Sequence, residues 1–100
     1  MATFNERLER VRTAGKLTTA DLSIWFARPY STVHAWLARG YEPWGAHADE
    51  ATRLLRLLER AIARRKFPMP YQLSPLERRE HVQQVRHALN GGLPQTRLAR

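Results

Sequence analysis

Residues 28–39 contain several side chains that could form hydrogen bonds with a ligand and that would lie on one surface of a helix. If Val33 and Trp36 face inward, the polar side chains between residues 30 and 39 face outward. The predicted ligand-facing residues are Arg28, Tyr30, Ser31, Thr32, His34, Ala35 and Arg39. Hydroxyls can donate to phosphate, imidazole or guanidinium can bond the edge of a base, and an alanine methyl can touch a thymine methyl. The chemistry that this set could perform is recognition of duplex DNA.

Two short amphipathic helices, between about residues 18 and 39, would position these side chains. Thr18 can cap the first helix, with Leu17 and Leu22 forming a hydrophobic staple across the cap. The break at residues 28–30 separates the helices, and Gly40 is expected to end the second. Helices this short cannot bury both apolar stripes alone, so a third element must pack on them.

The segment from residue 17 to residue 40 resembles the helix-turn-helix family, especially its excisionase-like and MerR-like members. A T-T-x-D-L start leads to T-V-x-x-W-L-x-x-G, and the matching residues are Thr18, Thr19, Asp21, Leu22, Thr32, Val33, Trp36, Leu37 and Gly40. The resemblance implies that the second helix enters a DNA major groove, and that Thr18 and Thr19 also lie over a phosphate. Ala27 stands where the family often has glycine, and Pro29 suits the first position of the second helix. The alternative is an ordinary helical hairpin without DNA contact.

The overall composition favours a polyanionic partner. The 100 residues include 17 Lys or Arg and 9 Asp or Glu, for a formal net charge of +8. This excess favours nucleic acid over a membrane. The sequence has no cysteine, no apolar run long enough to span a membrane and no signal-peptide core. We therefore expect a cytoplasmic protein, of a bacterium or a phage-infected host, that binds double-stranded DNA but no membrane and no small-molecule substrate.

Helical patterns on both sides of the segment predict an all-α fold, with an N-terminal helix-turn-helix of three short helices followed by a C-terminal helical hairpin. Thr3 and Glu6 predict a capping box for a helix over residues 1–14, and Gly15 is a natural stop. Residues 41–45 are either a short wing beside the DNA or a connector that packs Trp44 on the core. The expected divisions are a DNA-binding region at 1–45, a packing and oligomerisation hairpin at 46–92 and a basic tail at 93–100.

The hairpin is expected to consist of a long helix over residues 46–66 and a last helix that begins at the Ser74 cap. Its packing should leave Leu57 and the flank near Leu54 and Ala61 uncovered, which favours a homo-oligomer, either a dimer or a ring. A helix-turn-helix followed by such a hairpin also resembles phage small terminase subunits, in which rings of subunits recognise packaging-site DNA.

Four arginines, at positions 53, 56, 60 and 64, follow a second face of the long helix. Arg53, Arg56 and Arg60 are predicted as secondary phosphate contacts, which would give affinity without sequence information. The alternative is a solvated face, with an ion pair between Asp49 and Arg53.

Nothing in the sequence indicates an enzyme, a cofactor or a metal site. There is no nucleophile with a base, no phosphate-binding glycine loop and no carboxylate pair. Glu77 and His81 lie four residues apart, but two ligands do not make a metal site. The expected function is sequence-specific DNA binding by a small phage or bacterial regulator of transcription. Packaging-site recognition by a terminase subunit, and a protein-interaction module on a helix-turn-helix fold, are the alternatives.

Overall fold

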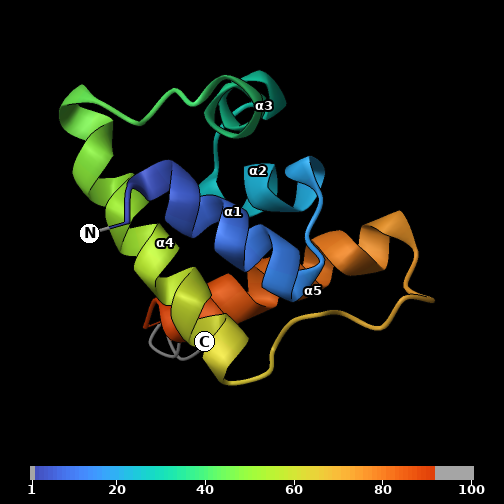
Figure 1. Ribbon diagram of the computed structural model, residues 1–100. Helices are drawn as coiled ribbons and strands as arrows, with labels where there is room; N and C mark the ends of the chain where they lie inside the picture. Colours follow the sequence, from blue (N-terminus) through green and yellow to red (C-terminus); the bar gives the residue numbers. More distant parts are fainter. Residues whose placement is uncertain (1, 92–100) are drawn as a thin grey trace.

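The computed structural model describes residues 2–91, which form five α-helices and one turn of 3-10 helix and contain no β-strand. The elements are α1 (Phe4–Gly15), α2 (Thr19–Phe26), α3 (Tyr30–Arg39), η1 (Gly45–His47), α4 (Ala48–Ala63) and α5 (Pro75–Leu89). The predicted all-α class is confirmed. Figure 1 shows α1 crossing α4, with α3 at one end of the molecule and the last turn of α4 at the other. Within residues 2–91, no helix combines the length and apolar character needed to cross a bilayer.

Capping boxes begin three of the helices, because an oxygen side chain and an acidic residue three positions later satisfy each other's backbone amides. Thr3 with Glu6 begins α1 and Ser74 with Glu77 begins α5, as predicted. Thr18 caps α2 as predicted, and its acidic partner is Asp21. Each cap stabilises its helix by about 1 kcal/mol.

Gly15 is the last residue of α1 and is not its stop. Lys16 takes the left-handed conformation instead, with φ of 52°, and the Leu17 amide donates to the Arg12 carbonyl over 2.9 Å. Gly15 is buried, and a Cβ placed there would lie 2.7 Å from Cδ1 of Ile62. The absence of a side chain at Gly15 therefore lets α1 approach α4 closely.

The predicted helix over residues 46–66 is divided and shortened. Its first residues form η1, and α4 begins only at Ala48. The other end closes at Arg65, whose φ is 61°, where the Lys66 amide donates to the Ala61 carbonyl over 2.9 Å. This left-handed cap satisfies the last carbonyls of α4 and ends it before the prolines that follow.

One hydrophobic core joins all five helices, and α4 lies at its centre. α1, α2 and α5 all pack on α4. Leu54, Leu57 and Ala61, predicted to be uncovered, are 3%, 8% and 0% exposed. The prediction of an apolar seam on this helix is therefore wrong, because three helices cover α4 where a hairpin would supply only one.

The C-terminal helix packs on the N-terminal half of the chain as well as on α4. The Arg78 side chain of α5 forms an ion pair of 2.5 Å with the buried carboxylate of Asp21 at the start of α2. Arg86 of α5 donates to the Trp25 carbonyl over 3.1 Å at the other end of α2. Residues 46–91 thus share one core with residues 2–45, and the predicted basic tail at 93–100 lies outside the described residues.

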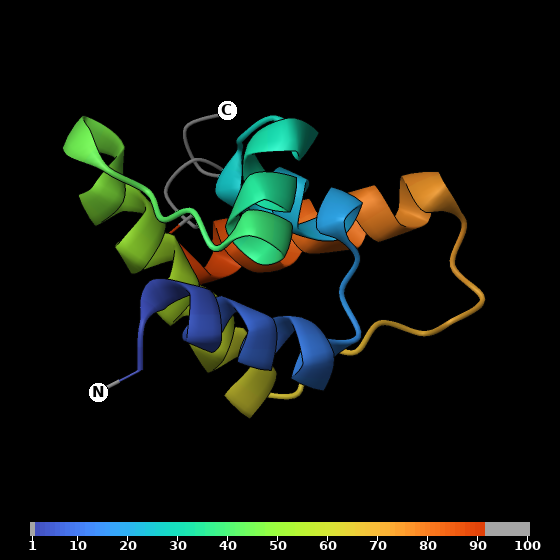
Figure 2. The ribbon, with the colours of Figure 1, turned by 45° about the horizontal axis from the view of Figure 1, so that its top comes forward.

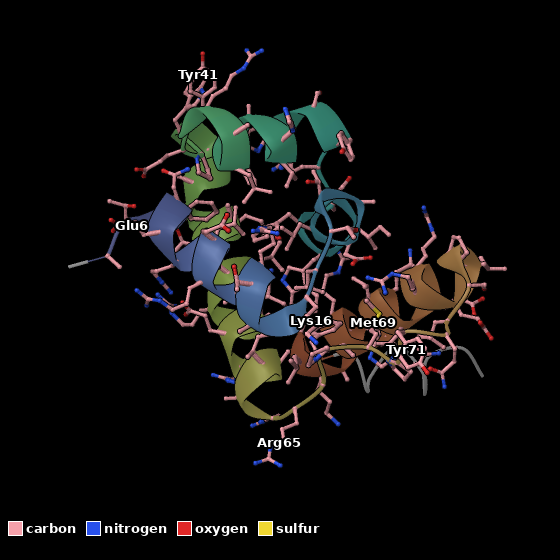
Figure 3. The ribbon with its side chains drawn as sticks, turned by 45° about the vertical axis from the view of Figure 1, so that its right-hand side comes forward. Glu6, Lys16, Tyr41, Arg65, Met69 and Tyr71 are labelled. Atoms are coloured by element: carbon pink, nitrogen blue, oxygen red, sulfur yellow. The ribbon has the colours of Figure 1, made fainter. Side chains whose placement is uncertain are left out.

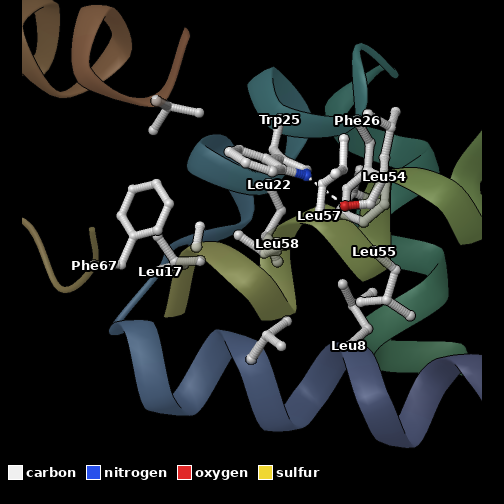
Figure 4. Packing of buried hydrophobic residues seen from close by; sticks show 14 of the residues in the cluster. Leu8, Leu17, Leu22, Trp25, Phe26, Leu54, Leu55, Leu57, Leu58 and Phe67 are labelled. Atoms are coloured by element: carbon white, nitrogen blue, oxygen red, sulfur yellow. Dashed lines mark hydrogen bonds between the residues drawn. The ribbon is translucent and has the colours of Figure 1, made fainter. Parts of the chain in front are cut away.

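Two aromatic residues join distant parts of the chain within the core. Nε1 of the Trp25 indole donates to the Leu54 carbonyl over 2.8 Å, which joins α2 to α4 (Figure 4). Phe67, in the proline-rich link between α4 and α5, is 3% exposed and packs edge-on against Trp25. The link is therefore attached to the core by this ring while it crosses to the start of α5 (Figure 2).

Candidate functional site

α3 is held by its inner face, which fixes the direction of its outer face. Val33 is fully buried and Trp36 is 5% exposed. Trp36 forms edge-on aromatic contacts with Phe4 and Phe26, at centroid distances of 5.3 and 5.4 Å. Nδ2 of Asn5 donates to the carbonyls of Trp36 and Tyr41, over 2.9 and 2.7 Å. These contacts hold α3 against α1 and α2, as the sequence pattern predicted for Val33 and Trp36.

A short turn joins α2 to α3. Ala27 ends α2 in the left-handed conformation with φ of 55°. Glycine adopts this conformation most easily, which explains why glycine is common at this position in the helix-turn-helix family. The Ser23 hydroxyl donates to the Arg28 carbonyl over 2.6 Å across the turn. Pro29 lies one position earlier than predicted, since it caps α3 and Tyr30 is the first helical residue.

The outer face of α3 presents the predicted residues to solvent. Tyr30, Ser31, His34 and Arg39 are exposed, and Ala35 and Thr32 are half-buried at the edges of that face. The rings of Tyr30 and His34 are stacked, with centroids 6.2 Å apart and planes inclined by 11°. The helix therefore offers one small, polar and partly aromatic surface, with a methyl group at its edge.

A groove of about 660 Å³ runs between α3 and the connector that follows it. Arg28, Ser31, Thr32 and Ala35 line one side, and residues 41–47 line the other. At one end Nη2 of Arg28 lies 2.6 Å from Nδ1 of His47. Because guanidinium only donates, His47 accepts through Nδ1 and carries its proton on Nε2. Sequence reasoning missed His47, for which no local pattern signals a partner nineteen residues away.

The connector does not pack its tryptophan on the core. Trp44 is 83% exposed and Tyr41 is 59% exposed, so the alternative in which Trp44 anchors the connector is wrong. The close packing of Phe4, Phe26 and Trp36 already fills the space beneath α3. The exposed aromatic rings of the connector thus stand beside the outer face of α3.

The two threonines predicted at the start of α2 lie apart from the turn to α3, by the length of that helix, about 12 Å. The Thr18 hydroxyl accepts from the Asp21 amide over 3.0 Å, and Thr19 is half-buried. Thr18 serves as the helix cap, and the carboxylate beside it is that of Asp21.

The arginines of α4 differ from one another in their partners. Arg53 forms an ion pair of 3.0 Å with Glu50 and a hydrogen bond with Asn90, so its partner is not the predicted Asp49. Arg56, Arg60 and Arg64 are exposed, and none forms an ion pair within residues 2–91. The last turn of α4 lies far from the groove beside α3, as the positions of Arg65 and Tyr41 show (Figure 3).

The arginines of α1 are largely neutralised by carboxylates. Arg7 bonds Glu59 of α4 over 2.7 Å, and this hydrogen bond raises the pKa of the guanidinium further above its usual range. Arg12 bonds Glu9 within the helix, which lowers the pKa of the Glu9 carboxyl. Of the three arginines on this helix, only Arg10 has no ion-pair partner among the described residues.

His81, which lies four residues after Glu77, makes contacts within the fold. Nε2 of His81 lies 3.0 Å from the Lys66 carbonyl, and the ring packs edge-on against Phe67. In the described part of the chain, no three His, Asp or Glu side chains come together as a potential ligand set. No family model, curated protein or solved structure matches the chain.

Proposed function

We propose that this protein binds duplex DNA through a helix-turn-helix formed by α2 and α3, with the outer face of α3 in the major groove. The observation that carries the proposal is the division of α3 into two faces. Its inner face is fixed by Val33, Trp36 and Asn5, while its outer face holds hydrogen-bonding side chains that have no ion-pair partner in residues 2–91. A helix with one anchored face and one polar face is what major-groove reading requires.

Each outer residue has a role that suits its chemistry. The Ser31 and Thr32 hydroxyls donate to phosphates at the edge of the groove. His34 bonds a base edge, and Ala35 lets the helix lie close to the bases. Arg39, exposed at the last turn of α3, binds a guanine edge or a phosphate. Arg28 joins the phosphate contacts, because its partner His47 does not neutralise its charge.

The biological role in this proposal is that of a small regulator of a phage or a bacterium. Helix-turn-helix proteins commonly read two half-sites as symmetric dimers, so we expect two copies on one operator. This expectation rests on the symmetry of DNA sites, since the apolar residues of α4 are covered within the chain. Light scattering of the protein with a selected duplex measures the stoichiometry, and a ring of many subunits would favour the packaging function instead.

The test separates base reading from general DNA affinity. Preferred duplexes are first selected from a random pool, and binding is then compared for wild type, His34→Ala and Arg39→Ala. Loss of one base contact costs about 1–3 kcal/mol, so each variant should lose about five- to 100-fold in affinity for the selected duplex. Thermal stability should not change, because both side chains are exposed.

Arg79→Ala, which removes an exposed arginine of α5, is the matched control and should bind as wild type does. If both α3 variants retain full affinity and selectivity for the selected duplex, α3 is not the reading element and the proposal is wrong.

A further inference from the structure

Most of the net positive charge of this chain is not located where α3 would read DNA. From residue 28 to residue 50 there are two arginines and three carboxylates, so the α3 region has no cationic excess. From residue 51 to residue 66 there are six basic residues and one carboxylate, Glu59. That carboxylate bonds Arg7 of α1 and is therefore already neutralised. The largest local excess of positive charge thus belongs to α4 and its end.

The basic residues of α4 form a regular row on its exposed face. Arg56, Arg60 and Arg64 recur every four residues, and Arg65 and Lys66 follow just beyond the end of α4. A spacing of four residues corresponds to about 6 Å along a helix, so each guanidinium could meet a successive phosphate of one strand. All five side chains are exposed, and none has an ion-pair partner in the described chain.

The C-terminal end of this row and the outer face of α3 lie at different ends of the molecule. α3 is at one end and the last turn of α4 is at the opposite end in both ribbon views (Figures 1 and 2). The longest dimension of the described chain is 42 Å. The outer face of α3 and the end of the row are therefore separate surfaces.

We infer that the exposed face of α4 with Arg56 and Arg60, together with Arg64, Arg65 and Lys66 at its C-terminal end, is a second nucleic-acid surface that holds the phosphate backbone of another stretch of duplex. The inference rests on the proposed function, and it assigns affinity and sequence reading to different faces. Backbone contacts of this kind are independent of sequence and weaken steeply with salt. A chain with both surfaces would bend one duplex around itself or bridge two.

A lipid surface fits the row less well than DNA does. Helices that bind membranes place apolar side chains in the bilayer beside their basic residues. On α4 the apolar side is already buried, since Leu54, Leu55, Leu57 and Leu58 are at most 8% exposed. The exposed row offers four guanidinium groups and one ammonium, and guanidinium groups bind phosphate oxygens in pairs.

The test uses the triple variant R56Q/R60Q/R64Q of the full chain and a random-sequence duplex. A matched triple variant, R10Q/K16Q/R79Q, removes the same number of exposed charges from other elements. Affinity is measured between about 50 and 200 mM salt, where each phosphate contact contributes about 0.9 to the slope of log affinity against log salt. We expect the α4 variant to reduce the slope by about 2 to 3 and the matched variant by less than 1.

The outcomes separate this inference from the proposed function. If the two triple variants lose equal slope, only net charge matters and the α4 surface is excluded. If the α4 variant retains DNA binding but loses binding to vesicles that contain anionic lipid, the row serves a membrane and the inference is overturned. Loss of slope only in the α4 variant supports it, even if the α3 variants show no change in sequence preference. Unchanged sequence preference in the α3 variants would refute the proposed function, but the second surface on α4 would still be supported.

Discussion

Within residues 2–91 no helix covers the outer face of α3 or the exposed face of α4, yet the two faces are built from different residues. The α3 face has a stacked tyrosine and histidine, small hydroxyls and neighbouring aromatic rings, with little net charge. The α4 face has a row of arginines and no exposed aromatic ring. The first is suited to distinguishing one ligand shape from another, and the second to holding any regular polyanion. The difference shows that a net charge of +8 indicates a kind of partner without locating the surface that binds it.

The largest effect is expected where the α3 face is supported from beneath. Trp36 is 5% exposed and contacts two phenylalanine rings, so Trp36→Ala should leave a cavity beneath α3. We expect the free energy of unfolding to fall by about 3–5 kcal/mol, measured by urea denaturation. Trp44→Ala is the control and should change stability little, because that indole is 83% exposed. Equal effects of the two substitutions would contradict the assignment of Trp36 as the anchor.

The position of the α4 face depends on close contact with α1, which Gly15 permits. In Gly15→Ala the new Cβ would lie 2.7 Å from Cδ1 of Ile62, so the Ile62 side chain must turn aside or the two helices must shift. Overpacking of this kind costs about 1–3 kcal/mol, measurable by thermal or urea unfolding. The double variant Gly15→Ala with Ile62→Val removes that methyl and should recover part of the loss. If Gly15→Ala caused no loss of stability, α1 and α4 would not be in close contact at this position.

Local features of this fold could be predicted from the sequence, and contacts between distant helices could not. The boxes at Thr3 and Ser74 need only the next three residues, which is why they were correct. The burial of Leu57 depends on three covering helices, and the pairing of Asp21 with Arg78 joins residues 57 positions apart. Neither leaves a periodic signal in the chain. An amphipathic pattern shows which face of a helix is apolar, but not how many neighbours will cover it.

The candidate site shows the same division. The outer face of α3 could be predicted from helical spacing, because the positions opposite the buried residues of one short helix must point away from the core. The groove beside it did not, since its second wall is a connector without periodicity and its end is closed by His47. The row on α4 was visible in the sequence as a spacing. That the arginines of this row have no carboxylate partner among residues 2–91 could not be predicted, because it depends on which residues Glu50 and Glu59 bond in the folded chain.

The smallest expected effect concerns α5, whose Arg78 and Arg86 hold both ends of α2 and so support the α3 face from behind. Hydrogen bonds from the Ser74 backbone and side chain lower the pKa of the Glu77 carboxyl at the start of α5. A lowered pKa in the folded state means that the cap contributes stability above the unfolded pKa of about 4.3, and loses it as pH falls toward the folded value. Glu77→Gln retains an acceptor but does not titrate. The difference in melting temperature between wild type and Glu77→Gln should therefore be largest near neutral pH and shrink as the pH falls below about 4. A difference that stays constant with pH would show that the charge of Glu77 contributes nothing to the cap.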